Sequence, residues 1–217
     1  MNDNSMEIID RHAQEGSRLR EFFFREQAQA IGQAALRMAL CLASGGKILL
    51  CGNGGSAADA QHLAAEFVNR FLIDRPAQAA IALNANTSNL TAIGNDLAFN
   101  RIFSRQVEAL GRKGDILLGI STSGNSANVL AAMQTALQKE MFTIGLTGQG
   151  GGDMRSFCRM LLAVPSDKTP LIQEIHITVG HLLCQLADYY LFENAELLEP
   201  YLQKNIESKD CDDHAYF

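Results

Sequence analysis

The chain has 217 residues and a mass of 23.6 kDa, a length that suits one domain of ordinary size. Hydrophobic residues make up 47% of it and charged residues 19%, and the formal net charge is −6. This acidic balance argues against a nucleic-acid-binding surface and favours a small-molecule partner. No apolar run approaches the roughly 18 residues that a membrane span needs. The polar, acidic N-terminus gives no export signal, so we expect neither membrane insertion nor secretion.

Five cysteines, an odd number without C-x-x-C spacing, point to reduced thiols and a cytoplasmic protein. Four of them have the apolar sequence neighbours typical of core thiols: Cys41, Cys51, Cys158 and Cys184. The fifth, Cys211, lies in a polar segment near the C-terminus. Abundant Ala and Leu in the helical stretches leave apolar helix surface for subunit contacts, so we expect a homo-oligomer.

The first element is helical. Apolar residues recur at three- and four-residue spacing from about Ser5 to Ser44, which predicts one long helix or two, ended by Gly45 and Gly46. Short apolar runs then alternate with helical segments. The predicted strands are Lys47–Cys51, Ala79–Leu83, Asp115–Ser121, Met141–Thr147 and Met160–Val164. Five strands separated by helices predict an α/β fold with a doubly wound, five-stranded parallel sheet.

After a turn-rich break at Pro165–Pro170, a last long apolar helix is predicted from Leu171 to about Phe192. We therefore expect a single domain over residues 1–217, with long helices at both ends of the chain. It divides into an N-terminal helical region (1–44), an α/β core with the last helix (45–193) and a polar tail (194–217). Residues after Lys204 offer little to bury, and we expect them to be exposed.

Two turns, Gly52–Ser56 and Ser121–Ser126, each follow a predicted strand and open a predicted helix. Backbone N–H groups at a helix start, with hydroxyls around them, bind anions such as phosphate. The first turn lacks the lysine of a P-loop and has Ala57 where a G-x-G-x-x-G motif needs glycine. It is open to a purely structural interpretation, a tight turn that needs glycine. The second turn carries four hydroxyls, more than helix capping requires.

Two helices offer residues that could carry chemistry. His62 and Glu66 are four residues apart, so they share a helix face and could bind one metal ion, pair with each other, or simply lie at the surface. The last helix places Gln173, His176 and His181 among apolar residues, where polar groups must be partnered, exposed or functional. We interpret His176 as an ordinary hydrogen-bonded histidine.

Four segments together resemble the bacterial phosphoheptose isomerases, members of the sugar-isomerase (SIS) domain group. The segments are Cys51–Glu66, Ala92–Asp96, Gly114–Asn128 and Ile172–His176. The resemblance extends over roughly residues 18–192. It implies the conversion of D-sedoheptulose 7-phosphate to D-glycero-D-manno-heptose 7-phosphate, the first step toward nucleotide-activated heptose.

The resemblance also implies roles for individual residues. It makes Glu66 and His181 the acid–base pair and implies one zinc ion per subunit, held by His62, Glu66, Gln173 and His181. Arg70, one helical turn beyond Glu66, matches a position that the family keeps near the site. The substrate pocket would be lined by Asn53, Gly54, Gly55, Glu66, Asn95, Asp96, Ser121, Thr122, Ser123, Ser126 and Gln173, with the second turn holding the phosphate. The assembly implied is a homotetramer.

Aldose–ketose isomerisation requires a base that removes a proton next to the carbonyl and an acid that protonates the oxygen, which gives an enediol. We assign the base to Glu66 and the acid to His181. A role of Glu66 as metal ligand competes with its basicity. Gln173 and His181 are eight residues apart, about 12 Å along one helix. We therefore predict that the site is completed across a subunit interface, or that the last helix begins after Gln173.

Two alternatives compete with this interpretation. Replication-initiator-associating adaptor proteins share the fold and the serine-rich turn but bind a protein partner, and they lack the acid–base pair that this chain keeps. A SIS isomerase acting on a pentose or hexose phosphate is the second alternative. The sequence does not distinguish whether the product serves lipopolysaccharide, capsule or a surface layer.

Overall fold

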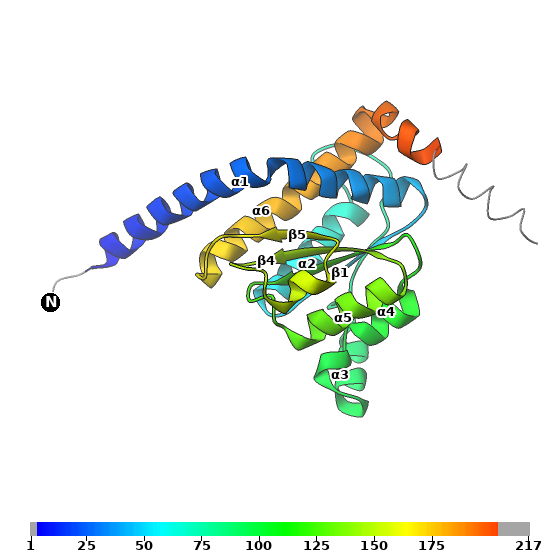
Figure 1. Cartoon of the computed structure of the whole chain (residues 1–217), viewed down its shortest axis with the longest axis horizontal. Coiled ribbons are helices and arrows are strands. Elements are labelled where there is room, and N and C mark those ends of the chain that lie inside the picture. Colours follow the sequence, from blue (N-terminus) through cyan, green and yellow to red (C-terminus); the bar gives the residue numbers. More distant parts are fainter. Residues whose placement is uncertain (1–3, 204–217) are drawn as a thin grey trace, which may run out of the picture.

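The computed structural model describes residues 4–203 of the chain. Helices and strands alternate through the middle of it, as the sequence pattern predicts (Figure 1). The strands are β1 (Ile48–Gly52), β2 (Ala80–Ala82), β3 (Ile116–Ser121), β4 (Phe142–Thr147) and β5 (Met160–Ala163). The α-helices are α1 (Ser5–Ala43), α2 (Gly55–Val68), α3 (Thr87–Asp96), α4 (Ser104–Leu110), α5 (Ala127–Gln138) and α6 (Thr169–Asp188). Short 3₁₀ or π turns occupy Phe99–Arg101, Gly152–Phe157, Tyr189–Glu193 and Ala195–Leu197.

The strands form one sheet in the order β2-β1-β3-β4-β5, and every neighbouring pair is parallel. The predicted doubly wound, five-stranded parallel sheet is thus confirmed. Within the sheet, the second strand of the chain, β2, is added on one side of β1. The later strands β3, β4 and β5 are added in order on the other side of β1. Winding therefore reverses between β1 and β3, and the crevice at the carboxyl ends of such strands is where open α/β sheets bind ligands.

Two helical layers cover the sheet because successive side chains of each strand point to opposite faces. Ile48 and Leu50 of β1 pack in a buried cluster with α1, α2 and α6, whereas Leu49 and Cys51 pack in a second cluster with α4 and α5. Figure 1 shows α1 and α6 on one side of the sheet and α4 and α5 on the other. All of β1 is buried, as a central strand covered on both faces should be.

The N-terminal region is one helix, α1, rather than two, and it ends just before Gly45, whose φ of +76° suits glycine. Its second half is buried against the core, whereas its first turns extend beyond the body of the molecule (Figure 1). Met6, Ile8 and Ile9 on that half are more than half exposed, at 64%, 57% and 58%. This chain alone therefore leaves an apolar helical surface uncovered, as the composition predicts.

The last helix, α6, begins at Thr169, two residues earlier than predicted. Pro170 lies in its first turn, where proline is tolerated because the N–H groups there have no partner within the helix. The predicted polar tail is wrong for its first part, because Leu198 is 3% exposed and packs against Ala39 and Leu40 of α1. The expectation for residues after Lys204 lies outside the described residues.

Candidate active site

The glycine turn, Gly52–Ser56, connects β1 to α2 at the carboxyl edge of the sheet. Gly54 has φ +56° and its carbonyl accepts hydrogen bonds from the amides of Ala57 and Ala58 in the first turn of α2. Asn53 and Asn128 form a reciprocal amide pair, with both N···O distances at 2.8 Å. The turn is therefore tied directly to α5, the helix that follows the second predicted turn.

The serine turn, Ser121–Ser126, leads from β3 into α5, and β3 is the neighbour of β1 in the sheet. The Ser121 and Ser126 hydroxyl oxygens lie 3.0 Å apart, and Ser123 Oγ accepts a hydrogen bond from the Asn125 amide. Ser126 precedes α5 but makes no side-chain capping bond to it. The Val129 amide donates to Asn128 Oδ1 at 2.9 Å, but Ser126 leaves the start of α5 uncapped next to several hydroxyls, an arrangement that suits a phosphate.

A second group of predicted residues comes together where α2 crosses α6. His62 Nε2 lies 2.9 Å from His181 Nε2 and 3.3 Å from Glu66 Oε1. The ligand atoms of all three side chains are within 4.8 Å of one another. The Phe71 ring stacks on His181 with centroids 5.5 Å apart. His62, Glu66 and His181, which we call the acid–base cluster, come from a single chain.

The close approach of α2 and α6 depends on Gly180. A Cβ at this position would lie 2.5 Å from the Leu63 side chain, which is buried. Real Cβ atoms do not come this close to neighbouring atoms, so only glycine allows this packing without displacement. Because Gly180 and Leu63 are the immediate neighbours of His181 and His62, this contact brings the two imidazoles together.

Gln173 does not join the acid–base cluster through its own helix. Both Gln173 and His181 lie within the continuous helix α6, so the expectation that this helix begins after Gln173 is wrong. The Gln173 side chain lies against Gly55, where a Cβ would be 2.6 Å from its Nε2 atom. The structure thus places Gln173 beside the glycine turn.

The remaining predicted residues lie at the surface. Asn95 and Asp96 close helix α3, and Asn95 Nδ2 donates to Asp96 Oδ1 at 2.8 Å. Arg70 is exposed beyond the end of α2, so it is not on the same helix as Glu66. Sequence reasoning missed Asn128 and Phe71 as neighbours of the site. Asn128 had a signal in the sequence, since it is the last residue of the Gly114–Asn128 segment that carries the family resemblance, whereas Phe71 had none.

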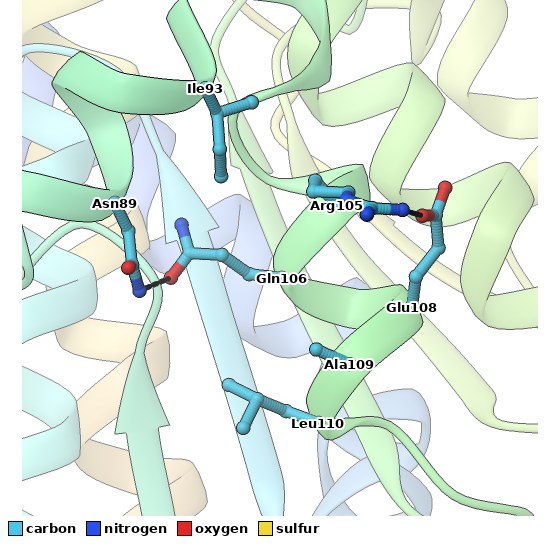
Figure 2. A pocket seen from close by; sticks show the side chains of 7 residues that line it. All are labelled: Asn89, Ile93, Arg105, Gln106, Glu108, Ala109 and Leu110. Atoms are coloured by element: carbon cyan, nitrogen blue, oxygen red, sulfur yellow. Dashed lines mark hydrogen bonds and ion pairs between the residues drawn. The ribbon is translucent and has the colours of Figure 1, made fainter.

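Two cavities lie away from these residues. One, of about 400 Å³, is lined by Asn89, Ile93, Arg105, Gln106, Glu108, Ala109 and Leu110. Figure 2 shows its polar walls paired with each other, Arg105 with Glu108 and Asn89 with Gln106. The buried Gln106 amide also donates to two backbone carbonyls, so its N–H groups are satisfied by the protein. The other cavity, of about 260 Å³, lies between α1 and α6 and contains none of the predicted site residues.

His176 is the ordinary buried histidine that we expected. It is 1% exposed, and its Nε2 lies 3.0 Å from the Thr147 carbonyl oxygen at the end of β4, to which it can donate. Burial lowers the pKa of His176 to about 4, because the charged imidazolium would lose its hydration. His176 is therefore neutral in the folded protein at neutral pH.

This pKa predicts a loss of stability in acid. The unfolded chain binds a proton at His176 as the pH falls below about 6.5, but the folded chain does not until about 4. The free energy of unfolding should therefore decrease by about 3 kcal/mol between pH 7 and pH 4 because of this residue. Urea unfolding of the wild type and His176→Gln, which keeps a donor for Thr147, should show the weaker pH dependence in the variant. Equal pH dependence would contradict the assignment.

Comparisons with known proteins agree with this geometry. The family model of the SIS domain matches residues 11–148. The phosphoheptose isomerase of Desulfovibrio desulfuricans is 66% identical over 210 residues, which cover 97% of this chain and 100% of the relative. This chain belongs to the phosphoheptose isomerase family. Two solved family structures share its fold. The Neisseria gonorrhoeae enzyme has a TM-score of 0.80 and 47% identity and covers 84% of this chain and 98% of its own. The Francisella tularensis enzyme has a TM-score of 0.83 and 40% identity and covers 87% and 99%.

Membership of the phosphoheptose isomerase family makes the chain an isomerase and speaks against the adaptor alternative. Its sequence similarity to the family extends over nearly the whole chain, beyond the segment that the SIS model matches. Among residues 4–203, no helix combines the length and apolarity that crossing a bilayer requires.

Proposed function

We propose that this protein converts D-sedoheptulose 7-phosphate to D-glycero-D-manno-heptose 7-phosphate through an enediol, as the first step of nucleotide-activated heptose biosynthesis. The observation that carries the proposal is the acid–base cluster, in which a carboxylate and two imidazoles converge within 4.8 Å. The phosphate would bind at the serine turn, where hydroxyls and the start of α5 favour an anion. The sugar would contact Asn53, Gly54 and Gly55 of the glycine turn.

In this mechanism Glu66 removes the C1 proton of the ketose while His181 protonates the C2 oxygen. The enediol is then protonated at C2 while its C1 hydroxyl loses a proton, which gives the aldehyde of the product. Positioned acid–base groups typically contribute 10²–10⁴-fold to such a rate. The Glu66 side chain is 22% exposed and the neighbouring His62 side chain is 48% exposed. The carboxylate is therefore reachable by a substrate yet partly shielded from water by its neighbours.

The cluster also fits a zinc ion. Ligand atoms on a tetrahedral zinc lie about 2.0–2.1 Å from the metal and hence about 3.3 Å apart, close to the 2.9 Å and 3.3 Å separations of His62 from His181 and Glu66. His62, Glu66 and His181 of one chain would hold the ion, and Gln173 from another copy of the chain would be the fourth ligand. When bound, such an ion supplies Lewis acidity that polarises the substrate carbonyl. Phe71 keeps the His181 ring in place by stacking.

We further propose a cytoplasmic homotetramer with sites at subunit interfaces. The exposed apolar residues on α1 support subunit contacts through this helix. Four cysteines of the described residues are free thiols, and burial raises the pKa of Cys41, Cys51 and Cys158 to about 12. Such thiols stay protonated and reduced in a cytoplasm.

The proposal is tested by following purified protein with sedoheptulose 7-phosphate by NMR, as prepared, after chelation, and after addition of Zn²⁺. We expect an aldoheptose 7-phosphate, its formation reduced at least about tenfold by chelation and restored by zinc. If chelation leaves the activity unchanged, the assignment of the acid–base pair stands, but the requirement for a metal ion is contradicted. No product under any condition from a folded oligomer would contradict the substrate, and arabinose and fructose phosphates would then be assayed in its place.

A further inference from the structure

A buried ion pair joins the chain segment after α2 to the end of α6. Arg75 Nε donates to Asp188 Oδ1 at 2.9 Å, and the two side chains are only 1% and 3% exposed. Neither residue belongs to the motifs that point to the site. Both lie beside the elements that carry it, because Asp188 is the last residue of α6 and Arg75 follows α2 by a short loop.

The same guanidinium also caps helix α2. Arg75 Nη2 donates to the Glu66 carbonyl at 2.9 Å, and Nη1 donates to the Phe67 carbonyl at 2.7 Å. These carbonyls belong to the last turn of α2, where backbone acceptors have no partner within the helix. The planar fork of arginine can satisfy several acceptors at once. Arg75 therefore holds the backbone of the residue that carries the proposed base.

Asp188 extends this restraint to the proposed acid. It follows His181 by seven residues on α6, close to two full helical turns, so both lie on the same side of the helix. The contact between Gly180 and Leu63 fixes how closely α2 and α6 approach. The Arg75–Asp188 pair fixes how far one helix slides along the other, and this sets Glu66 against His181.

Stability alone gives a weak account of this pair. Burial of an ion pair costs about as much as the attraction returns, and apolar residues of similar volume often serve equally well. Asp188 Oδ2 is buried without a hydrogen-bond partner among the described residues. Burial raises the pKa of Asp188, and Arg75 opposes that rise. Burial disfavours the charged form of the Asp188 carboxylate, and among the described residues only Arg75 compensates for it. Because such a pair adds little stability, we infer that its role is to fix geometry.

We propose that Arg75 and Asp188 are positioning residues, which hold Glu66 and His181 in register for proton transfer. The proposal rests on the proposed function, since it gives these two residues a part in the same reaction. Neither Arg75 nor Asp188 touches the substrate in this account. Their effect passes through the Glu66 backbone and the axis of α6.

The test uses two variants and a matched control in the full-length protein. Arg75→Lys keeps the charge but loses the fork, and Asp188→Asn keeps the shape but loses the charge. The control is Asp115→Asn, because Asp115 is also 3% exposed and pairs with Lys47, but at the amino end of β3. Asp115 also accepts from the backbone amides of Lys47 and Arg112, at 3.0 Å and 2.8 Å. All three variants should be destabilised to similar extents.

Two readouts separate positioning from mere stability. With sedoheptulose 7-phosphate, Arg75→Lys and Asp188→Asn should lower kcat by about 100-fold relative to Asp115→Asn, as displacement of a reacting group by about 1 Å does, while KM changes little. In the metal-free protein without substrate, the imidazole NMR signals of His62 and His181 should shift in both variants but not in the control.

The proposal is overturned if either readout is unchanged in the variant that remains folded. If wild-type protein does not act on sedoheptulose 7-phosphate, the proposed function fails, but the imidazole signals still decide the positioning role. Shifted signals would then support it, and unshifted signals would overturn it. If one of the two variants does not fold, the other is compared with Asp115→Asn by the same two readouts.

Discussion

Replacing Glu66 with glutamine lowers kcat for the isomerisation by about 10³-fold, because the amide cannot accept the C1 proton. The change leaves shape and volume almost unaltered, so KM should change by no more than a few-fold. The carboxylate is 22% exposed and its Oε1 pairs with His62 at 3.3 Å, so the packing of α2 on α6 should survive. Steady-state kinetics with sedoheptulose 7-phosphate and thermal unfolding check both expectations.

Glu174→Gln is the matched control for this variant. Glu174 is a carboxylate on α6 that pairs with His12 of α1 at 2.7 Å, with both side chains about half exposed. Its replacement should leave kcat within about twofold of wild type, because exposed pairs contribute little. Zinc content measured on the same preparations separates the two roles of Glu66. A Glu66→Gln variant that keeps zinc and still loses activity has lost its base, whereas one that keeps more than a tenth of the activity contradicts the assignment.

The fold was predictable because each strand has a clear signal in its own local sequence. The runs Ile48–Cys51 and Ile116–Ile120 inside the predicted strands are continuously apolar, as buried parallel strands are, and lead into turns rich in glycine or serine. Every predicted strand boundary agrees with the structure to within one residue. The last helix extends further at its start than predicted, because Pro170 looked like a stop but lies in the first turn.

The site was predictable in its members but not in its arrangement. Periodicity places His62 and Glu66 on one helix face, and the family resemblance adds His181. Their meeting depends on the crossing of α2 and α6 at Gly180, a tertiary contact that leaves no local pattern in the sequence. The amide pair of Asn53 with Asn128 could not be predicted from the sequence for the same reason, since the two residues are 75 positions apart. Arg75 gave no signal either, because a lone arginine before a proline is usually a surface residue.

The glycine turn and Glu66 of the acid–base cluster lie at opposite ends of helix α2. Glu66 lies eleven residues after Gly55 on the straight course of α2, which is about 16 Å along the helix. Gln173, held beside Gly55, is about 12 Å from His181 along α6. An extended heptose phosphate has seven carbons, and each bond advances it by little more than about 1.3 Å along its length. One chain therefore separates its glycine turn and Gln173 from its acid–base cluster by more than a substrate spans.

Mixed oligomers of Glu66→Gln and Gln173→Ala chains should therefore regain activity that neither variant has alone. If each site combines the acid–base cluster of one copy with Gln173 of another, random assembly from equal amounts makes about a quarter of the sites wild type. The mixture, dissociated and reassembled together, should show about a quarter of wild-type activity. The same variants reassembled separately and then combined give the baseline.

The control mixture pairs Glu66→Gln with His181→Ala. These two residues come from the same chain in the acid–base cluster, so no mixed oligomer contains a site with both intact, and no activity should return. Rescue in this control would mean that Glu66 and His181 of one site come from different copies. Failure of the Glu66→Gln and Gln173→Ala mixture, with both chains present in the same oligomers by mass spectrometry, would place Gln173 and Glu66 of one chain in one site. The substrate would then have to bridge the separation along α2 within that chain.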